Sequence, residues 1–330
     1  MVGIAISGLG EVSQNHYRGI LYTEYGELVG VFSHSKERAE KIAKLWNTKP
    51  YHSYDEMLKD EKVDSVVICS ADEHHYEQAI KAMKAGKHVL VEKPLSLSLK
   101  EVIDMARVSK EENVTLFPVH NYIFRPKVMR AKKLIQDKEI GEPTYALFIV
   151  TQRMEENVAK KYHGALFTQA YHSIYVSNYL LGLPKEIYAS WSTITYKELK
   201  SDEIFVSTFK YANGGIGNIV ANWAADDISS DSWMWLDKIV GTKGVITISS
   251  FGDVSYQEGV SFMMAWTVDY RESFINLMKH FVDDVLARKR KPIQTVYDAI
   301  LVHDIMEKLR FSAEEGKRLV YYPPKLEGLI

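Results

Sequence analysis

The fold is decided by the stretch Gly-Lys-His-Val-Leu-Val-Glu-Lys-Pro at residues 86–94. Gly86 predicts the end of a helix, and Val89–Val91 predict a short buried strand. Lys93 follows that strand between an acid and a proline, and a proline restricts the residue before it to extended backbone geometry. Ligands bind at strand ends in open α/β sheets, so we predict that Lys93 is an active-site residue. An ordinary lysine that closes a strand is the alternative.

The N-terminus carries a second signal, a dinucleotide-binding turn. Val2–Ser7 predict a strand that runs directly into Gly-Leu-Gly-Glu-Val-Ser at residues 8–13. The first glycine permits a tight turn, the second lets the backbone approach a pyrophosphate, and the next helix offers N–H groups to the phosphates. Ser13 replaces the usual third glycine, and its small side chain still permits close packing of helix and strand. We predict cofactor contacts from Gly8, Gly10, Glu11 and Val12.

The end of the second predicted strand, Leu28–Phe32, indicates which dinucleotide binds. NAD-binding proteins usually have an acid here that holds the ribose 2′-hydroxyl. This chain has Ser-His-Ser-Lys-Glu-Arg at residues 33–38, whose hydroxyls, histidine and cations can hold a 2′-phosphate by charge-assisted hydrogen bonds. We therefore predict NADP(H) as the preferred cofactor and NAD(H) as the alternative, with contacts from Ser33, His34, Lys36 and Arg38. Otherwise, the two cations are only the solvated face of the next helix.

Composition narrows the class of protein. The chain has 330 residues, of which 46% are hydrophobic and 25% charged, with a formal net charge of −2. This length predicts two domains, and the near-neutral charge without a dense basic stripe argues against nucleic acid as a partner. Apolar runs are too short to span a bilayer, and no secretory signal is visible, so we expect a cytoplasmic protein. The single cysteine, Cys69, excludes an internal disulfide and a cysteine-built metal site.

Strands and helices alternate through the first third of the chain, which predicts a doubly wound parallel sheet. The predicted strands are 2–7, 28–32, 65–70, 89–91 and 115–119, and the predicted helices are one after Glu11, 36–46, 76–85 and 99–111.

Beyond about residue 122, β-rich segments follow one another without intervening helices, which predicts a mostly antiparallel sheet. A hairpin signal stands at residues 212–215. The segments are 144–153, 186–195, 204–211, 215–223, 237–241 and 245–249, and two terminal helices are expected at 271–288 and 295–315. We predict a dinucleotide-binding domain at 1–122 and a substrate-binding and oligomerisation α+β domain at 123–330.

With these residues the chain resembles the Gfo/Idh/MocA family of oxidoreductases. The Gly-Lys-His-Val and Glu-Lys-Pro block is the most specific part of the resemblance, which covers essentially the whole chain. The further motifs, in the family's order, are His16 after the fingerprint, Ser70-Ala71-Asp72 with His75, Arg125-Pro126, Ile140-Gly141, a helix start between Gly164 and His172, and Ser312-Ala313. The resemblance implies a Rossmann domain, an open-faced sheet domain, and nicotinamide chemistry on sugars, polyols or related small molecules. It also implies homodimers or homotetramers built through the C-terminal sheet.

The resemblance also implies site residues. Lys93 stands where the family's lysine lies near nicotinamide and substrate, and His172 stands where the family has its acid-base residue; Ser70, Ala71, His75 and Glu92 are further expected cofactor contacts. Hydride transfer at a carbon requires a proton to move at its oxygen, which histidine can transfer and a lysine can support by polarising that oxygen.

One departure from the family pattern concerns this histidine. Family members commonly carry aspartate four residues before it and three after it, and this chain has Thr168 and Tyr175. On a helix both would share a face with His172, but a histidine without its carboxylate is less firmly oriented and a weaker base. Two interpretations follow: Tyr175 or another hydroxyl takes part in proton transfer, or turnover has been lost. We favour the first.

Substrate recognition is less well specified. Asn121, Tyr122, Arg125 and Thr168 are expected near substrate, although Arg125 can equally form an interdomain salt bridge. Arg153 and Tyr162 are further candidates that can line the pocket. Three tryptophans can stack on a sugar, although aromatic residues in such a domain more often pack a core: Trp223, Trp233 and Trp235.

The remaining candidates are possible metal ligands that lack the clustered donors of a metal site: His280, His303 and Asp304.

Together these features predict a metal-independent oxidoreductase that prefers NADP(H) and acts on a carbohydrate-like alcohol or its carbonyl form. Two alternatives remain: a glycosidase of the same fold that uses bound NAD for transient oxidation, and a non-catalytic nucleotide-binding sensor.

Overall fold

The computed structural model describes residues 1–225, 234–249, 255–258, 261–262 and 269–326, and it divides the chain into two compact units. Unit 1 contains Met1–Phe124, Tyr270–Leu301 and the end of the chain from Lys325. Unit 2 contains Arg125–Asp269 and Val302–Pro324. The predicted boundary after residue 122 lies close to the first crossing, but a single boundary is wrong, because the chain returns to unit 1 at Tyr270.

The chain returns to unit 1 at Tyr270 because apolar side chains of this segment are buried in the core of that unit. Phe274 and Phe281 are buried in unit 1, and the Phe281 ring lies 5.3 Å from that of Phe117. Phe274 also meets the His16 ring edge-on at 5.1 Å. The helical segment from Asp269 therefore completes the core of the first unit.

Unit 1 is a doubly wound α/β unit, as predicted. Within the described residues its sheet has six parallel strands in the order β3-β2-β1-β4-β5-β6. This order reverses between β1 and β4, and in open α/β sheets ligands bind at such a reversal, outside the carboxyl ends of the strands. The strands are β1 (Val2–Ser7), β2 (Gly26–Phe32), β3 (Lys49–Tyr51), β4 (Ser65–Ile68), β5 (His88–Val91) and β6 (Leu116–Pro118).

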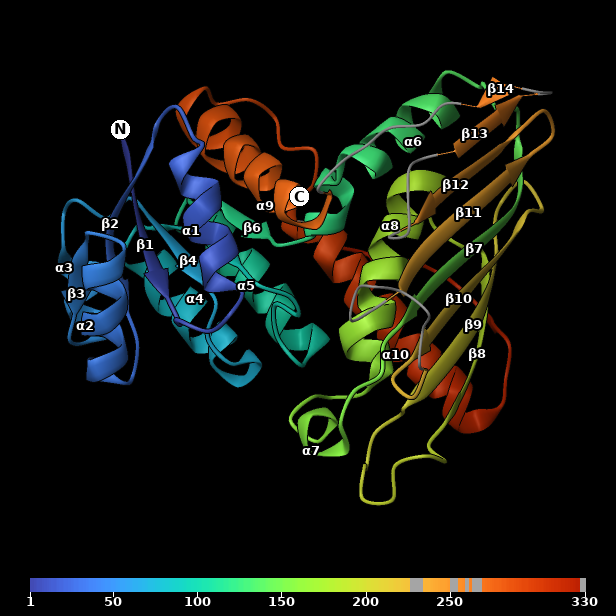
Figure 1. Cartoon of the computed structure of the whole chain (residues 1–330), viewed down its shortest axis with the longest axis horizontal. Coiled ribbons are helices and arrows are strands. Elements are labelled where there is room, and N and C mark those ends of the chain that lie inside the picture. Colours follow the sequence, from blue (N-terminus) through green and yellow to red (C-terminus); the bar gives the residue numbers. More distant parts are fainter. Residues whose placement is uncertain (226–233, 250–254, 259–260, 263–268, 327–330) are drawn as a thin grey trace. The chain divides into compact units, whose positions relative to one another are not determined.

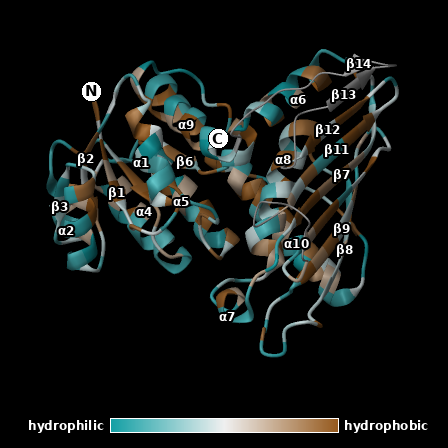
Figure 2. Ribbon diagram, in the orientation of Figure 1, coloured by the Kyte–Doolittle hydropathy of each residue, from teal (hydrophilic) through white to brown (hydrophobic). Residues whose placement is uncertain are grey.

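Helices connect the strands of unit 1, and buried apolar runs form its core. Ile4, Val66 and Leu90 are fully buried, as parallel strands covered on both faces require, and Figure 2 shows these strands as hydrophobic ribbons. The helical elements are α1 (Ser13–Leu21), α2 (Lys36–Leu45), α3 (Tyr54–Lys59), η1 (Asp72–His74), α4 (His75–Lys84), α5 (Leu99–Glu111), η2 (Asn121–Phe124), α9 (Asp269–Lys279) and η4 (His280–Ala287).

Unit 2 is built on a second, mostly antiparallel sheet. Its nine strands among the described residues have the order β14-β13-β12-β11-β7-β10-β9-β8-β15, and β7 and β10 pair in parallel. The strands are β7 (Pro143–Thr151), β8 (Glu186–Ser192), β9 (Ile204–Lys210), β10 (Ile216–Asn222), β11 (Met234–Gly241), β12 (Val245–Ser249), β13 (Ser255–Glu258), β14 (Ser261–Phe262) and β15 (Leu319–Val320).

Helices of unit 2 lie over one face of this sheet (Figure 1). They are α6 (Pro126–Gln136), α7 (Glu156–Ala159), the π-helical turn η3 (Leu166–Ala170), α8 (Tyr171–Leu181) and the later part of α10 (Val296–Glu315). The expectation that the β-rich segments lack intervening helices is wrong between β7 and β8. There α7, η3 and α8 form, and the apolar residues of α8, including Ile174 and Val176, are buried.

The other face of the sheet carries half-exposed apolar side chains. Tyr145, Tyr188, Val206 and Ile216 are between 37% and 46% exposed. Strand register places them on one face, because Ile216 pairs with Tyr145 and Val220, on the face of Ile216, pairs with Val206. We call this the open face.

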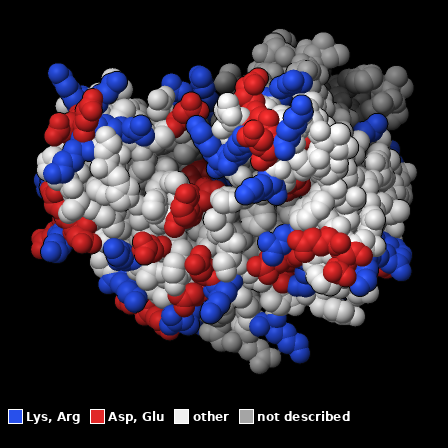
Figure 3. Space-filling view, turned by 90° about the horizontal axis from the view of Figure 1, so that it is seen from below, with Lys and Arg blue, Asp and Glu red and all other residues white. Residues whose placement is uncertain are grey.

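The charged side chains are of both signs on the face shown in Figure 3, where basic and acidic groups alternate. Among the described residues, no helix combines the length and apolarity that a bilayer crossing requires.

Candidate active site

The nucleotide-binding turn joins β1 to α1. Gly8 has a φ of 89°, and a Cβ there would lie 2.3 Å from the Ser70 nitrogen, so only glycine fits. A Cβ on the exposed Gly10 would meet no described atom within 4 Å, so the turn faces open space. Buried Ser13 donates from Oγ to the Gly10 oxygen at 2.5 Å and so closes the turn. The predicted contacts Gly10, Glu11 and Val12 therefore lie together on an accessible turn.

The predicted ribose-side residues lie between β2 and α2. Ser35 caps α2 by accepting the Arg38 N–H at 3.2 Å, and Ser33 Oγ accepts the Ser35 N–H at 3.3 Å. His34 and the two cations, Lys36 and Arg38, are exposed. The His34 ring also lies 5.5 Å from that of His74, a residue the sequence had not suggested.

The carboxyl ends of β1 and β4 are tied together by a buried glutamine that sequence reasoning missed. The hydroxyls of Ser7 and Ser70 donate to Gln78 Oε1 at 2.9 and 3.1 Å. Ala71, beside Ser70, is exposed. Gln78 gave no signal in the sequence because it lies on the inner face of α4, where glutamine is an ordinary helix residue.

The segment after β5 carries Glu92 and Lys93. Glu92 Oε1 lies 2.7 Å from His16 Nε2, and Glu92 Oε2 accepts the Lys93 N–H at 3.1 Å. The Lys93 side chain is half-buried, and the following peptide bond to Pro94 is cis. Burial lowers the pKa of the Lys93 ammonium, against the opposing carboxylates of Glu92 and Asp72. A lysine with a lowered pKa at a strand end is typical of an active site.

His75 is buried and contacts backbone on both sides of its ring. Its Nδ1 lies 2.7 Å from the Pro94 oxygen and its Nε2 lies 3.0 Å from the Ser70 oxygen. The side chain therefore connects two loops of unit 1. A direct cofactor contact from it stays a prediction.

Asn121 and Tyr122 lie in η2 and are buried within unit 1. Asn121 Nδ2 donates to Ser273 Oγ at 3.2 Å, and the Tyr122 ring meets that of Tyr270 edge-on at 6.3 Å. Arg125 begins unit 2, and its guanidinium stacks on the Trp235 ring 3.7 Å from the centroid. Contacts of these three residues with substrate stay predictions.

The predicted acid-base histidine lies in the first turn of α8 in unit 2. His172 Nδ1 is 2.6 Å from the hydroxyl of Tyr175, which is buried. Thr168 lies in the π-helical turn before α8 and donates from Oγ1 to the Gly164 oxygen at 2.7 Å. Of the two residues that replace the expected carboxylates, Tyr175 therefore contacts the imidazole and Thr168 bonds to backbone.

Asp202 caps the helical segment that carries these residues. Its Oδ2 accepts the Leu166 N–H at 2.8 Å, and its backbone oxygen accepts the Ala165 N–H at 2.9 Å. Gly164 has a φ of 99°, and a Cβ there would lie 2.0 Å from Asp202 Oδ1. Burial raises the pKa of Asp202 to about 6, although these N–H groups oppose the shift. Sequence spacing could not reveal this cap, which comes from 36 residues downstream.

Two of the aromatic candidates of unit 2 pack the core, as the sequence favoured. Trp223 and Trp235 are at most 1% exposed, so a role for them as sugar-stacking platforms is wrong in this structure. Tyr162 is 44% exposed and meets the Trp223 ring edge-on at 6.5 Å, and Arg153 is exposed. Trp233 lies outside the described residues.

The remaining histidine candidates have other contacts. His280 Nδ1 lies 3.2 Å from Asp284 Oδ2, and its Nε2 accepts the Ile293 N–H at 3.1 Å. Burial lowers the pKa of His303 to about 4, and Asp304 pairs with Lys308. The described residues contain no group of three or more His, Cys, Asp or Glu side chains that could hold a metal ion.

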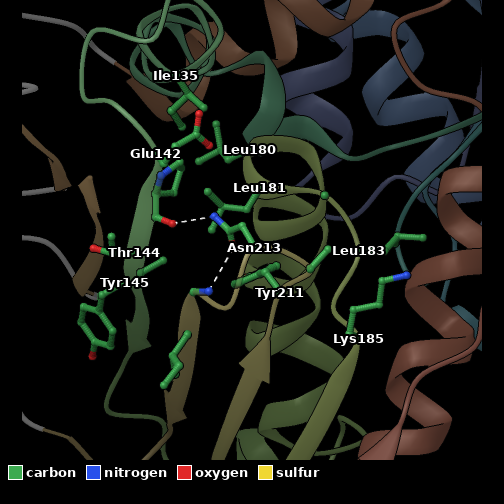
Figure 4. Close-up of a pocket in the computed structure, with 16 residues that line it drawn as sticks. Ile135, Glu142, Thr144, Tyr145, Leu180, Leu181, Leu183, Lys185, Tyr211 and Asn213 are labelled. Carbon is green, nitrogen blue, oxygen red and sulfur yellow. Dashed lines mark hydrogen bonds between the residues drawn. The ribbon is translucent and has the colours of Figure 1, made fainter. Parts of the chain in front are cut away.

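Unit 2 also has a depression of about 490 Å³ at the ends of β7 and α8 (Figure 4). The β9–β10 hairpin forms one side of it. There Asn213 donates from Nδ2 to the Pro143 oxygen at 2.8 Å and accepts the Gly215 N–H at 3.0 Å. None of the predicted site residues lines this depression.

Comparison with known proteins identifies the family. Residues 2–120 match the family model described as "Oxidoreductase family, NAD-binding Rossmann fold", and residues 128–247 match "GFO/IDH/MocA C-terminal domain". Myo-inositol 2-dehydrogenase of Thermotoga maritima is 25% identical over 86% of this chain and 87% of its own length. The scyllo-inositol 2-dehydrogenase (NAD(+)) of Bacillus subtilis is 28% identical over 91% and 90%.

Solved structures agree on the fold. Levoglucosan dehydrogenase, in complex with NADH and levoglucosan, has a TM-score of 0.89 at 20% identity and covers 98% of this chain and 100% of its own. A probable dehydrogenase from Thermotoga maritima has a TM-score of 0.85 at 21% identity, covering 97% and 99%. The two family models together cover both halves of the chain. The nucleotide-binding turn and the Glu-Lys-Pro segment both lie within the first of them. The protein therefore belongs to the Gfo/Idh/MocA family and is an oxidoreductase with an NAD-binding Rossmann domain.

Proposed function

We propose that the protein transfers hydride between a nicotinamide cofactor, preferably NADP(H), and a carbohydrate-like alcohol or its carbonyl form. The observation that carries this proposal is the 2.6 Å contact between His172 Nδ1 and the Tyr175 hydroxyl. It gives the imidazole an orienting partner at a position where the family commonly has a carboxylate, so loss of the carboxylate does not leave the histidine unsupported.

The residues of unit 1 fit a dinucleotide. Gly8 permits the close approach of the β1 and β4 ends, and the open space beside Gly10 leaves room for a pyrophosphate at the start of α1. The exposed cations Lys36 and Arg38 support a 2′-phosphate at the start of α2, where the helix dipole also favours an anion. Lys93 would lie on the nicotinamide side.

The bound nicotinamide would take up or supply the hydride. The chain's own residues would manage the proton and the charge on the substrate oxygen. We assign proton transfer at this oxygen to His172 Nε2, because Nδ1 is engaged by Tyr175. The Tyr175 hydroxyl can accept from Nδ1–H or donate to Nδ1, so the neutral imidazole can present either a lone pair or an N–H at Nε2.

We assign stabilisation of the developing negative charge on the same oxygen to the Lys93 ammonium. Glu92 fixes the backbone of Lys93 by accepting its N–H, and the half-buried side chain starts from that fixed position.

The relatives support the proposed substrate class. The two curated relatives are named as dehydrogenases of inositols, which are cyclic polyols, and a structural neighbour binds levoglucosan. We propose a carbohydrate-like substrate for this chain on that basis.

We also propose that the protein forms homodimers or homotetramers through the open face, whose apolar side chains are half-exposed.

The roles are tested with Lys93→Ala, His172→Ala and Tyr175→Phe. We expect the first two to lower kcat by at least about 100-fold and the third by about 10-fold, with cofactor affinity largely kept. Steady-state kinetics and cofactor titration measure both quantities. Normal turnover in Lys93→Ala and His172→Ala would reject the assigned site.

A further inference from the structure

Two buried histidines contact the Glu92-Lys93-Pro94 segment, one at its first residue and one at its last. His16, which is 0% exposed, contacts the Glu92 carboxylate at 2.7 Å, and His75, which is 1% exposed, contacts the Pro94 oxygen at 2.7 Å. All of these residues belong to unit 1. The lysine of the segment is therefore flanked by two buried polar contacts, each from a different helix.

The His16 contact connects Lys93 to the first nucleotide turn. His16 lies in α1, one turn after the start of that helix at Ser13. Its Nδ1 makes no hydrogen bond within the described part of the chain, so Nε2 is the ring nitrogen that carries the contact to Glu92. Glu92 then accepts the Lys93 N–H through its second oxygen. A shift of α1 would therefore move the backbone of Lys93.

The His75 contact connects Lys93 to the turn after β4 that contains Ser70 and Ala71, which we call the second nucleotide turn because cofactor contacts are predicted there. His75 begins α4, directly after η1, and its Nε2 reaches the Ser70 oxygen at 3.0 Å. Both acceptors of this ring are carbonyl oxygens, which cannot donate. Each ring nitrogen that carries a proton therefore donates to the carbonyl oxygen beside it.

We infer that His16 and His75 are positioning residues that fix Lys93 relative to the two nucleotide-binding turns. They act through Glu92 and Pro94 and need not touch substrate or cofactor. Displacing a reacting group by about 1 Å can cost about 100-fold in rate, so two short buried contacts beside the lysine have kinetic consequences. This inference rests on the proposed role of Lys93 in hydride transfer.

The test separates a positioning role from a merely structural one by following Lys93 itself. Competitive acetylation of the whole protein across pH, with mass spectrometry of the Lys93 peptide, gives an apparent pKa for this lysine without any turnover. The variants are His16→Leu and His75→Leu, which remove the contacts, and His16→Gln and His75→Asn, which keep a donor near Nε2 and Nδ1. His88→Gln is the matched control, because His88 lies at the opposite end of β5.

We expect the apparent pKa of Lys93 to rise towards that of exposed lysines in both leucine variants, because burial holds it down and a released segment is hydrated. In the same variants kcat falls by about 10- to 100-fold, while the Kd of NADPH stays within about threefold. In His16→Gln and His75→Asn, the apparent pKa of Lys93 and kcat return most of the way to their wild-type values. The control His88→Gln leaves the Lys93 labelling profile unchanged.

The inference would be overturned if the leucine variants fold and show the same Lys93 labelling profile and the same kcat as the wild type. If the leucine variants do not fold, His16→Phe and His75→Phe decide, because they keep a planar ring and lack its hydrogen-bonding nitrogens: an unchanged Lys93 profile with a reduced melting temperature in both would show a structural role only. If the wild type turns over no substrate, the proposed function fails, and the labelling profile still decides whether the histidines hold Lys93.

Discussion

At the scale of single residues, the proposed preference for NADP(H) depends on Lys36 and Arg38. Both are exposed at the start of α2, and the end of β2 has hydroxyls and a histidine in place of an acid. A hydrogen bond to a charged group contributes about 1.5 to 3 kcal/mol, which corresponds to about 10- to 100-fold in affinity. Only a ligand with a 2′-phosphate would lose that contribution when the cations are removed.

We therefore expect the pair Lys36→Ala and Arg38→Ala to weaken NADPH by about 10- to 100-fold and NADH by less than about threefold. Fluorescence titration at one salt concentration measures both affinities. The pair Lys41→Ala and Lys44→Ala is the matched control, since both are exposed lysines of the same helix. Equal losses for the two cofactors would remove the reason to prefer NADP(H).

Residue identities in the site were predictable where a local motif constrains them. Gly8, Gly10 and Lys93 stand in fixed spacing to strands, and the structure places them at the carboxyl ends of β1 and β5. Contacts between distant residues were not predictable. His16 and Glu92 are 76 positions apart, and Asp202 caps a helix that begins 36 positions earlier, so neither leaves a periodic signal in the sequence.

At the scale of elements, the helical segment with Thr168, His172 and Tyr175 depends on its Asp202 cap. Burial raises the pKa of Asp202 to about 6 in the fold, from an ordinary value of about 3.8. The folded state therefore prefers the protonated form, and the stability that this preference contributes is complete below about pH 4. It is lost as the pH rises towards 6, by about 3 kcal/mol at most.

We expect Asp202→Asn to remove this pH dependence. Relative to the variant, the wild type should lose unfolding free energy between pH 4 and pH 6 and change little above about pH 7. Urea unfolding at several pH values measures the difference, with Glu61→Gln as the control at an exposed acid. A constant difference between wild type and Asp202→Asn over that range would show that Asp202 does not titrate as described.

Several elements could not be predicted for physical reasons. β3 is three residues long and contains a proline, so it has too few positions to show a period. The π-helical turn η3 interrupts the regular helix before α8, and this irregularity follows from tertiary packing. The parallel sheet was predictable because its buried strands are continuous apolar runs between helices.

At the scale of the whole molecule, the open face of unit 2 bears on assembly. Tyr145, Tyr188, Val206 and Ile216 are half-exposed there, and a contiguous apolar surface of this kind typically binds another protein. The helices cover the opposite face of the same sheet (Figure 1). A second copy of the chain would bury these side chains.

We expect light scattering to give a dimer or tetramer for the wild type and a smaller species for Val206→Glu with Ile216→Glu. A charge buried without a partner opposes association. Leu45→Glu is the control, because Leu45 is 71% exposed on α2 of unit 1. A monomeric wild type, or an unchanged mass in the double variant, would reject the open face as the interface.

The division into units was predictable only in part. The change from alternating helices and strands to successive strands places a boundary near residue 122, and the structure has its first crossing after Phe124. The return of the chain at Tyr270 was not predictable, because the pattern of α9 shows that one face is buried without showing which core buries it.

We propose above all that this chain transfers hydride between NADP(H) and a carbohydrate-like substrate. The most direct measurement is titration of the pure protein with NADPH and NADH, followed by absorbance of the reduced nicotinamide across a panel of sugars, polyols and sugar ketones. We predict tighter binding of NADPH and an absorbance change with one class of these compounds, abolished by Lys93→Ala. Tight cofactor binding with no absorbance change on any compound would contradict the claim and favour a nucleotide-binding protein without turnover.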